Sequence, residues 1–184
     1  YRELLQKAQF EVMVCGADGQ KAGEMVVKQL AAISRAPLVL SAAEAVGIWP
    51  QQQDYKEPMD TAQGKLCLLF SSGRLPDPAE TAAMRMATLA LGALPTSRLF
   101  MNVREKQSLC YYCACSYSGY SGTLCIDSGI DHANAQKAAA AIVKELHTLQ
   151  NEPISEEEMD NARRALRNSF TAAADSPDAL ESWT

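Results

Sequence analysis

The sequence predicts an α+β fold, with a largely antiparallel β-sheet and helices packed mainly on one face of it. Two observations lead to this expectation. Two β-rich runs, residues 109–118 and 123–130, are joined by the short segment GYSG, which is typical of a β-hairpin. The chain then carries two amphipathic helical patterns, over residues 131–151 and 153–174. Hairpin strands combined with such helices are typical of an α+β domain.

The first third of the chain predicts short elements. A helix-like piece at residues 1–8 leads into a β-rich run at residues 10–16, which ends at a glycine. Residues 20–33 place apolar side chains at helical spacing. Residues 34–63 contain prolines and no long pattern, so we expect a loop with one strand around residues 51–59.

The middle of the chain predicts a strand and two helices. Residues 64–72 form a nearly continuous apolar run, which is typical of a central strand covered on both faces. Residues 79–94 predict a helix that stops near Gly92 and Pro95, and a second, shorter helix follows Pro95.

Capping residues mark the starts of the last two helices. Asp131 can cap the first of them. Ser155 and Glu158 form the pattern of a capping box at the second. The acidic run of which Glu158 is part lies in a first helical turn, where it favours the helix dipole.

Length, charge and composition limit the possible classes of protein. The 184 residues fit one domain, and 47% hydrophobic with 21% charged residues is ordinary for a globular core. The net charge of −5 gives no general attraction to nucleic acid or anionic lipid. No apolar run approaches the ~20 residues of a membrane helix. We therefore expect no nucleic-acid partner, because of the charge, and no membrane partner, because of the charge and the absence of such a run. We expect residues 1–184 to be one α+β domain excised from a longer protein.

The six cysteines leave two interpretations open. Four of them crowd into residues 110–125, which could indicate a disulfide framework. They lie inside apolar strand patterns, however, where a reduced thiol packs as a small hydrophobe. We therefore favour reduced cysteines and a cytoplasmic location.

A metal site or catalytic set within the chain is not expected. The two histidines, His132 and His147, are fifteen residues apart, or about 22 Å along a straight helix. Neither lies in an HxxEH pattern. Cys110 and Cys113 form a CxxC without a second pair of ligands. Strand alternation would place Cys113 and Cys115 on one face and Cys110 on the other.

Two residues at the expected helix-to-strand junction remain of interest, Arg104 and Tyr111. From their spacing alone, the ordinary interpretation is a solvated charge at a helix end and a half-buried strand tyrosine. The surrounding stretch, SRLFMNVREKQSLCYYCACSYSGYSGTLCIDSGI, resembles the signature region of the insulinase/pitrilysin family of zinc peptidases. The opening YRELLQKAQFEVMVCGAD resembles the start of the second domain in that family. The segment ISEEEMDNARRALRNSF, followed by DSPDALESW, resembles its closing helices.

This resemblance implies a role within a larger peptidase. Members have two related halves, each of two α+β domains, which close around a peptide. Zinc lies in one half, held by HxxEH and a distant glutamate, and the facing half supplies an arginine and a tyrosine seven residues apart. Arg104 and Tyr111 match that pair, whereas Cys110 departs from the alanine or glycine of many members.

The resemblance thus implies the second domain of a half without a zinc motif, in the mitochondrial-processing-peptidase/insulinase-like fold. This chain would bind no cofactor, and zinc would lie in a partner half or another domain. Arg104 would hold a carbonyl of the peptide substrate, and Tyr111 would stabilise the oxyanion formed when zinc-bound water attacks.

Whether the protein is an enzyme stays open at this point. The isolated chain is expected to be inactive, because the zinc site would lie elsewhere. The alternative is a catalytically silent structural or peptide-binding subunit of the same family. An HxxEH motif elsewhere in the full-length protein would make that protein its own zinc peptidase.

Overall fold

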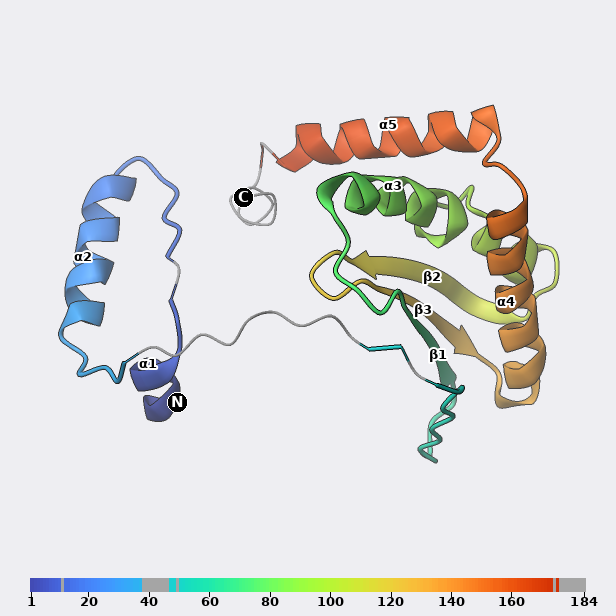
Figure 1. Cartoon of the computed structure of the whole chain (residues 1–184), viewed down its shortest axis with the longest axis horizontal. Helices are drawn as coiled ribbons and strands as arrows, with labels where there is room; N and C mark the ends of the chain where they lie inside the picture. Colours follow the sequence, from blue (N-terminus) through green and yellow to red (C-terminus); the bar gives the residue numbers. More distant parts are fainter. Residues whose placement is uncertain (11, 38–46, 49, 174, 176–184) are drawn as a thin grey trace. The chain divides into compact units, whose positions relative to one another are not determined.

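The computed structural model divides the chain into two compact units, Tyr1–Ala42 with Ser169–Thr184, and Ala43–Asn168 (Figure 1). The residues that the structure describes are 1–10, 12–37, 47–48, 50–173 and 175. Residue 11 of the expected first strand, residue 174 of the expected last helix, and residues 176–183 of the closing segment lie outside these ranges. One domain over residues 1–184 stays a prediction.

The described residues of the first unit contain two complete helices, α1 (Arg2–Lys7) and α2 (Gly19–Ala31). The segment after α2 returns to α1, because the Ala36 amide donates to the Gln6 carbonyl at 3.0 Å. Both helices were predicted, but the strand at residues 10–16 was wrong: its described residues form no strand. A strand needs a paired neighbour, and the described part of this unit contains no other strand.

The second unit contains an antiparallel sheet of β1 (Gly64–Ser71), β2 (Cys110–Ser118) and β3 (Thr123–Ile130) in the order β1-β3-β2. The predicted hairpin of β2 and β3 is confirmed. The strand expected around residues 51–59 was wrong, since these residues pair with no strand.

The central position expected for β1 was also wrong, because β1 lies at an edge of the sheet that the described residues form. Its apolar run conceals an alternation. Leu66, Leu68 and Phe70 pack against the core, whereas Leu69 is 49% exposed on the other face. An apolar residue at a solvent-facing position made a half-covered strand resemble a buried one.

A helical layer covers one face of the sheet. Helix α3 (Pro78–Thr88) continues as a π-helical segment, η1 (Leu89–Ala93), and a second π-helical segment, η2 (Leu99–Glu105), follows. These segments confirm the two helices predicted here. A Cβ atom on Gly92 would lie 3.1 Å from the backbone nitrogen of Cys115, so glycine permits η1 to approach β2 closely.

The C-terminal helices begin where the capping residues predicted. A short 3₁₀ turn, η3 (His132–Asn134), precedes α4 (Ala135–Asn151), and α5 (Glu156–Ala173) follows. The Asp131 carboxylate accepts from the Ala133 amide at 3.0 Å. The Ser155 amide donates to the Glu158 carboxylate at 2.8 Å, which completes the predicted capping box with the Ser155 hydroxyl.

The core lies between this helical layer and the sheet, which confirms the α+β class. Segments α3, η1 and η2 contact β2, while α4 contacts β1 (Figure 1). Its fully buried side chains come from four elements: Leu91, Leu99, Val103, Ile126 and Ile142. Among the described residues, no helix has the length and hydropathy needed to cross a membrane.

Candidate functional site

The predicted junction is built at the end of η2. Its turns are wider than those of an α-helix, as the bond from the Lys106 amide to the Met101 carbonyl at 3.0 Å shows. Ser108 has a φ of +51°, which is unusual for a residue with a side chain. The Ser108 amide donates to the Arg104 carbonyl at 3.0 Å, and the Leu109 amide to the Val103 carbonyl at 3.2 Å. These bonds end the helix and direct the chain into β2.

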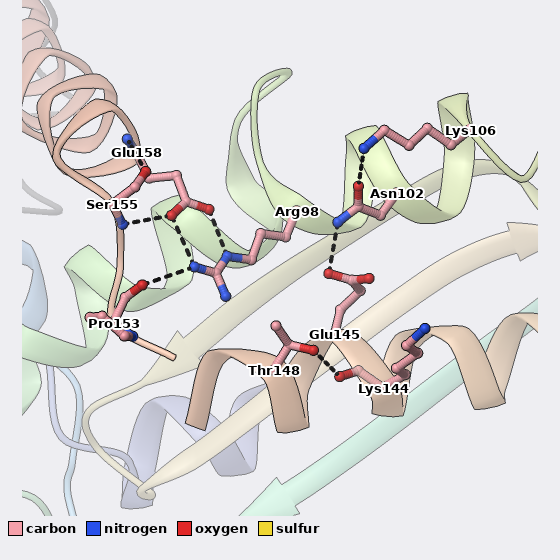
Figure 2. Close-up of polar contacts among 9 residues, drawn as sticks. All are labelled: Arg98, Asn102, Lys106, Lys144, Glu145, Thr148, Pro153, Ser155 and Glu158. Carbon is pink, nitrogen blue, oxygen red and sulfur yellow. Dashed lines mark hydrogen bonds and ion pairs between the residues drawn. The ribbon is translucent and has the colours of Figure 1, made fainter. Parts of the chain in front are cut away.

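The inner face of η2 is fastened to two other helices (Figure 2). Arg98 forms two parallel hydrogen bonds with Glu158 of α5, from Nε to Oε1 at 2.6 Å and from Nη2 to Oε2 at 2.9 Å. One turn further on, Asn102 donates to the largely buried Glu145 of α4 at 2.8 Å. The helix that ends at the junction is therefore held at two points, which restricts the movement of its last turn.

A β-bulge displaces Tyr111. Cys110 pairs with Ile130, and the next pair is Tyr112 with Gly129, so Tyr111 is an extra residue on β2. Tyr111 is 57% exposed. Because the bulge shifts the alternation by one, Cys110 packs against the core on the same side as Cys113. The expected opposite orientation of Cys110 was wrong for this reason.

Arg104 lies against this bulge and has three partners. Its Nε donates to the Tyr111 carbonyl oxygen at 2.8 Å. Its guanidinium carbon lies 4.5 Å from the centre of the Phe100 ring, and its Nη1 lies 3.1 Å from Oε1 of Glu105. The structure thus brings the two predicted residues together through the backbone of the bulge, seven residues after the arginine.

An open concavity of about 440 Å³ lies at the junction. The residues that line it come from η2, the following turn, β2, and the loop and 3₁₀ turn η3 after β3: Arg104, Glu105, Ser108, Leu109, Cys110, Tyr111, Asp131 and Asn134. The contribution of Asp131 and Asn134 was not predicted from the sequence. The register of the hairpin could have indicated it, because pairing of Cys110 with Ile130 places the residues after Ile130 beside the junction.

The described ranges contain no cluster of side chains suited to holding a metal ion. No group of three or more histidine, cysteine or acidic residues there could hold a metal ion. The ring of His132 packs over Gly64, and His147 pairs with Gln150 at 3.1 Å. Burial raises the pKa of both the Cys113 and the Cys115 thiol to about 12, so neither is a nucleophile near neutral pH.

The fold and the junction define an α+β domain with a concavity where η2 meets β2, and comparison with known proteins identifies its class. The family model described as the peptidase M16 inactive domain matches residues 1–166, and the chain belongs to this family. The resemblance to the insulinase/pitrilysin peptidases, in the type of domain without a zinc motif, is thereby confirmed.

Relatives agree with this assignment. The chain is 26% identical over its whole length to a Bacillus subtilis protein named "Probable inactive metalloprotease YmfF", of which it covers 43%. It is 30% identical over 64% of its length to the B. subtilis "Uncharacterized zinc protease YmxG", of which it covers 29%. A crystal structure of a conserved protein from Enterococcus faecalis V583 matches 86% of the chain and 38% of that protein, with a TM-score of 0.72 and 26% identity. The chain therefore spans less than half the length of these proteins.

Proposed function

We propose that this domain supplies Arg104 and Tyr111 for peptide binding and transition-state stabilisation to a zinc-bearing partner half. The observation that carries the proposal is the bulge at Tyr111. It leaves the tyrosine 57% exposed, while its backbone carbonyl anchors the arginine at 2.8 Å. Both side chains line the same concavity.

The arginine is oriented and still has donors for a ligand. Its Nε and Nη1 are directed at the Tyr111 carbonyl and Glu105, and no described residue accepts a hydrogen bond from Nη2. The Phe100 ring supports one face of the guanidinium. A guanidinium fixed in this way can hold a peptide carbonyl without losing further side-chain entropy.

The tyrosine suits a different task. A phenol hydroxyl beside the scissile carbonyl donates a hydrogen bond to the oxygen on which negative charge develops. Zinc in the partner half would activate the attacking water. Arg104 thus binds the peptide in the ground state. Tyr111 stabilises the negative charge that is present only in the transition state.

The protein that contains this domain is proposed to be a two-domain half, cytoplasmic, with reduced cysteines. The zinc site would lie in the partner half or in another domain. Its substrate would be a peptide, because the concavity offers donors for carbonyl oxygens.

The second candidate function is a catalytically silent structural or peptide-binding subunit. The name of one relative, "Probable inactive metalloprotease YmfF", favours it. A peptide-binding subunit would retain the role of Arg104 without the role of Tyr111 in turnover, whereas a structural subunit would need neither.

The test is steady-state kinetics of peptide cleavage by the full-length protein assembled with its zinc-bearing half. Tyr111→Phe should lower kcat about 100-fold with little change in KM, since the hydroxyl acts in the transition state. Arg104→Ala should raise KM as well. Tyr120→Phe, at a tyrosine that is 93% exposed in the hairpin turn, and Lys106→Ala are the matched controls.

The outcomes separate the two functions. Wild-type kinetics in Tyr111→Phe and Arg104→Ala, with unchanged melting temperatures, would refute the proposed role of the pair. An assembled wild-type protein that binds peptide but does not cleave it, with binding weakened by Arg104→Ala alone, would establish the silent peptide-binding subunit.

A further inference from the structure

The sheet face opposite the helical layer carries two thiols in contact. Cys67 of β1 and Cys125 of β3 place their sulfur atoms 3.5 Å apart. They are diagonal neighbours, since Cys67 is paired with Asp127 and Cys125 with Leu69. Diagonal positions on adjacent antiparallel strands are farther apart than directly opposite ones, so 3.5 Å between two short side chains is a close approach. Cys67 is exposed and Cys125 is half-buried, so small reagents in solution can reach the pair.

The other cysteines lie in different surroundings. Cys113 and Cys115 are buried in the core, and Cys110 packs against it from the same side. Cys15 is exposed but belongs to the other compact unit. Contact between two sulfurs on an accessible face is therefore the particular property of Cys67 and Cys125.

We propose that Cys67 and Cys125 form a reversible dithiol–disulfide site whose oxidant is a small-molecule disulfide such as oxidised glutathione. In the first step, the Cys67 thiolate attacks one sulfur of the oxidant. The small disulfide bond breaks, and one glutathione leaves as a thiolate and takes up a proton. Cys67 now carries glutathione in a mixed disulfide.

In the second step, Cys125 loses its proton and attacks the Cys67 sulfur of the mixed disulfide. The second glutathione leaves, and an internal disulfide remains. In total, two protein thiols are oxidised and one small disulfide is reduced to two thiols. The greater exposure of Cys67 makes it the residue that the oxidant meets first.

The bond requires a small movement of the strand backbone, because diagonal positions lie near the limit of the Cα separation that a disulfide spans. A disulfide requires about 2.05 Å between the sulfur atoms, so the pair has to close by about 1.5 Å. Strand β1 can adjust because it is an edge strand in the sheet of the described residues. Burial, and then the neighbouring Cys67 thiol, raise the pKa of Cys125 to about 11, so closure should accelerate as pH rises toward that value.

The experiment incubates the full chain in glutathione buffers of increasing oxidised fraction, alkylates the remaining thiols and maps them by mass spectrometry. Two of the six cysteines should become protected together, in one crosslinked pair of peptides containing Cys67 and Cys125. The crosslinked protein should melt at a higher temperature than the reduced protein, because the disulfide restricts the unfolded chain.

Two variants define the site. Cys125→Ser should stop at a glutathione adduct on Cys67, and Cys15→Ser should leave the crosslink unchanged. The proposal is overturned if the wild-type chain retains six alkylatable thiols in the most oxidising buffer. It is also overturned if the wild type accumulates the Cys67 adduct without closure, or if Cys67 pairs with another cysteine.

Discussion

Two arginines, one at each end of η2, show how one residue type takes opposite roles along a single helical segment: Arg98 caps its start and Arg104 lies in its last turn. Arg98, at its beginning, has a side chain that is only 11% exposed and makes two parallel bonds to the 21% exposed Glu158 (Figure 2). Arg104, in its last turn, is 37% exposed and contacts a backbone carbonyl, an aromatic ring and the adjacent Glu105. Arg98 fastens η2 to α5, whereas Arg104 faces an open concavity.

The difference teaches that position relative to the core decides what an arginine in a motif does. Removal of Arg98 leaves the poorly hydrated Glu158 carboxylate without its cationic partner, which lowers the stability of the folded protein. Removal of Arg104 leaves groups that water can reach. We therefore expect stability to depend on Arg98 and function to depend on Arg104.

The largest effect should follow Arg98→Ala. Loss of the guanidinium should lower the free energy of unfolding by about 3 kcal/mol, measured by urea denaturation, because the partly buried Glu158 carboxylate loses its cationic partner and keeps only its bonds to Ser155. Arg74→Ala is the matched control, since Arg74 forms a similar forked pair with Glu80 but is 63% exposed, and solvent screens it. Equal losses in the two variants would contradict the contrast between buried and exposed arginines.

Acid should remove the same interaction in the intact protein. Hydrogen bonding to Arg98 lowers the pKa of Glu158 from 4.5 to about 2. A depressed pKa in the folded state stabilises the protein above pH 4.5, and this contribution is lost as pH falls from 4.5 toward 2. The loss should be about 2–3 kcal/mol in unfolding experiments at successive pH values, and Glu158→Gln should show a flatter profile over that window.

A smaller effect, of opposite sign, is expected at the end of η2. Ser108→Gly should stabilise the protein by about 0.5–1 kcal/mol, because glycine adopts a φ of +51° without the steric strain of a Cβ atom. Gln107→Gly, one residue earlier and without a positive φ, should destabilise it. Thermal melts of the two variants that shift in the same direction would show that the strain at Ser108 is not relieved by glycine.

The smallest effect on stability should come from Arg104→Ala. Its partners at the surface remain accessible to water, so the free energy of unfolding should change by about 0.5 kcal/mol or less. Circular dichroism melts of this variant and of Arg98→Ala, measured side by side, provide the comparison. A loss as large as that of Arg98→Ala would make Arg104 a structural residue and would weaken its proposed role in peptide binding.

Local signals in the sequence predicted most of the fold. The hairpin of β2 and β3, the helices and the capping box of Ser155 with Glu158 each depend on residues close together in the chain. The position of β1 in the sheet does not depend on nearby residues, because an edge strand is defined by the distant segments that pair with it. Leu69, apolar yet 49% exposed, hid the alternation that would have revealed it.

The candidate site was predictable only in part. The spacing of Arg104 and Tyr111, together with the family resemblance, indicated the pair. The two residues are connected by a hydrogen bond from Arg104 to the Tyr111 backbone carbonyl. This bond depends on a β-bulge that the CYYC segment does not predict. Asp131 joined the site through strand register, which alternation alone does not fix.

The bulge also bears on how this domain can change during evolution. If Tyr111 were deleted, Cys110 would precede Tyr112 directly, and β2 would alternate regularly with the same residues facing the core. A chain one residue shorter would satisfy the same ladder of hydrogen bonds. The pairing of β2 with β3 therefore does not itself require a residue at position 111, so we expect a chain without Tyr111 to keep the same strand register.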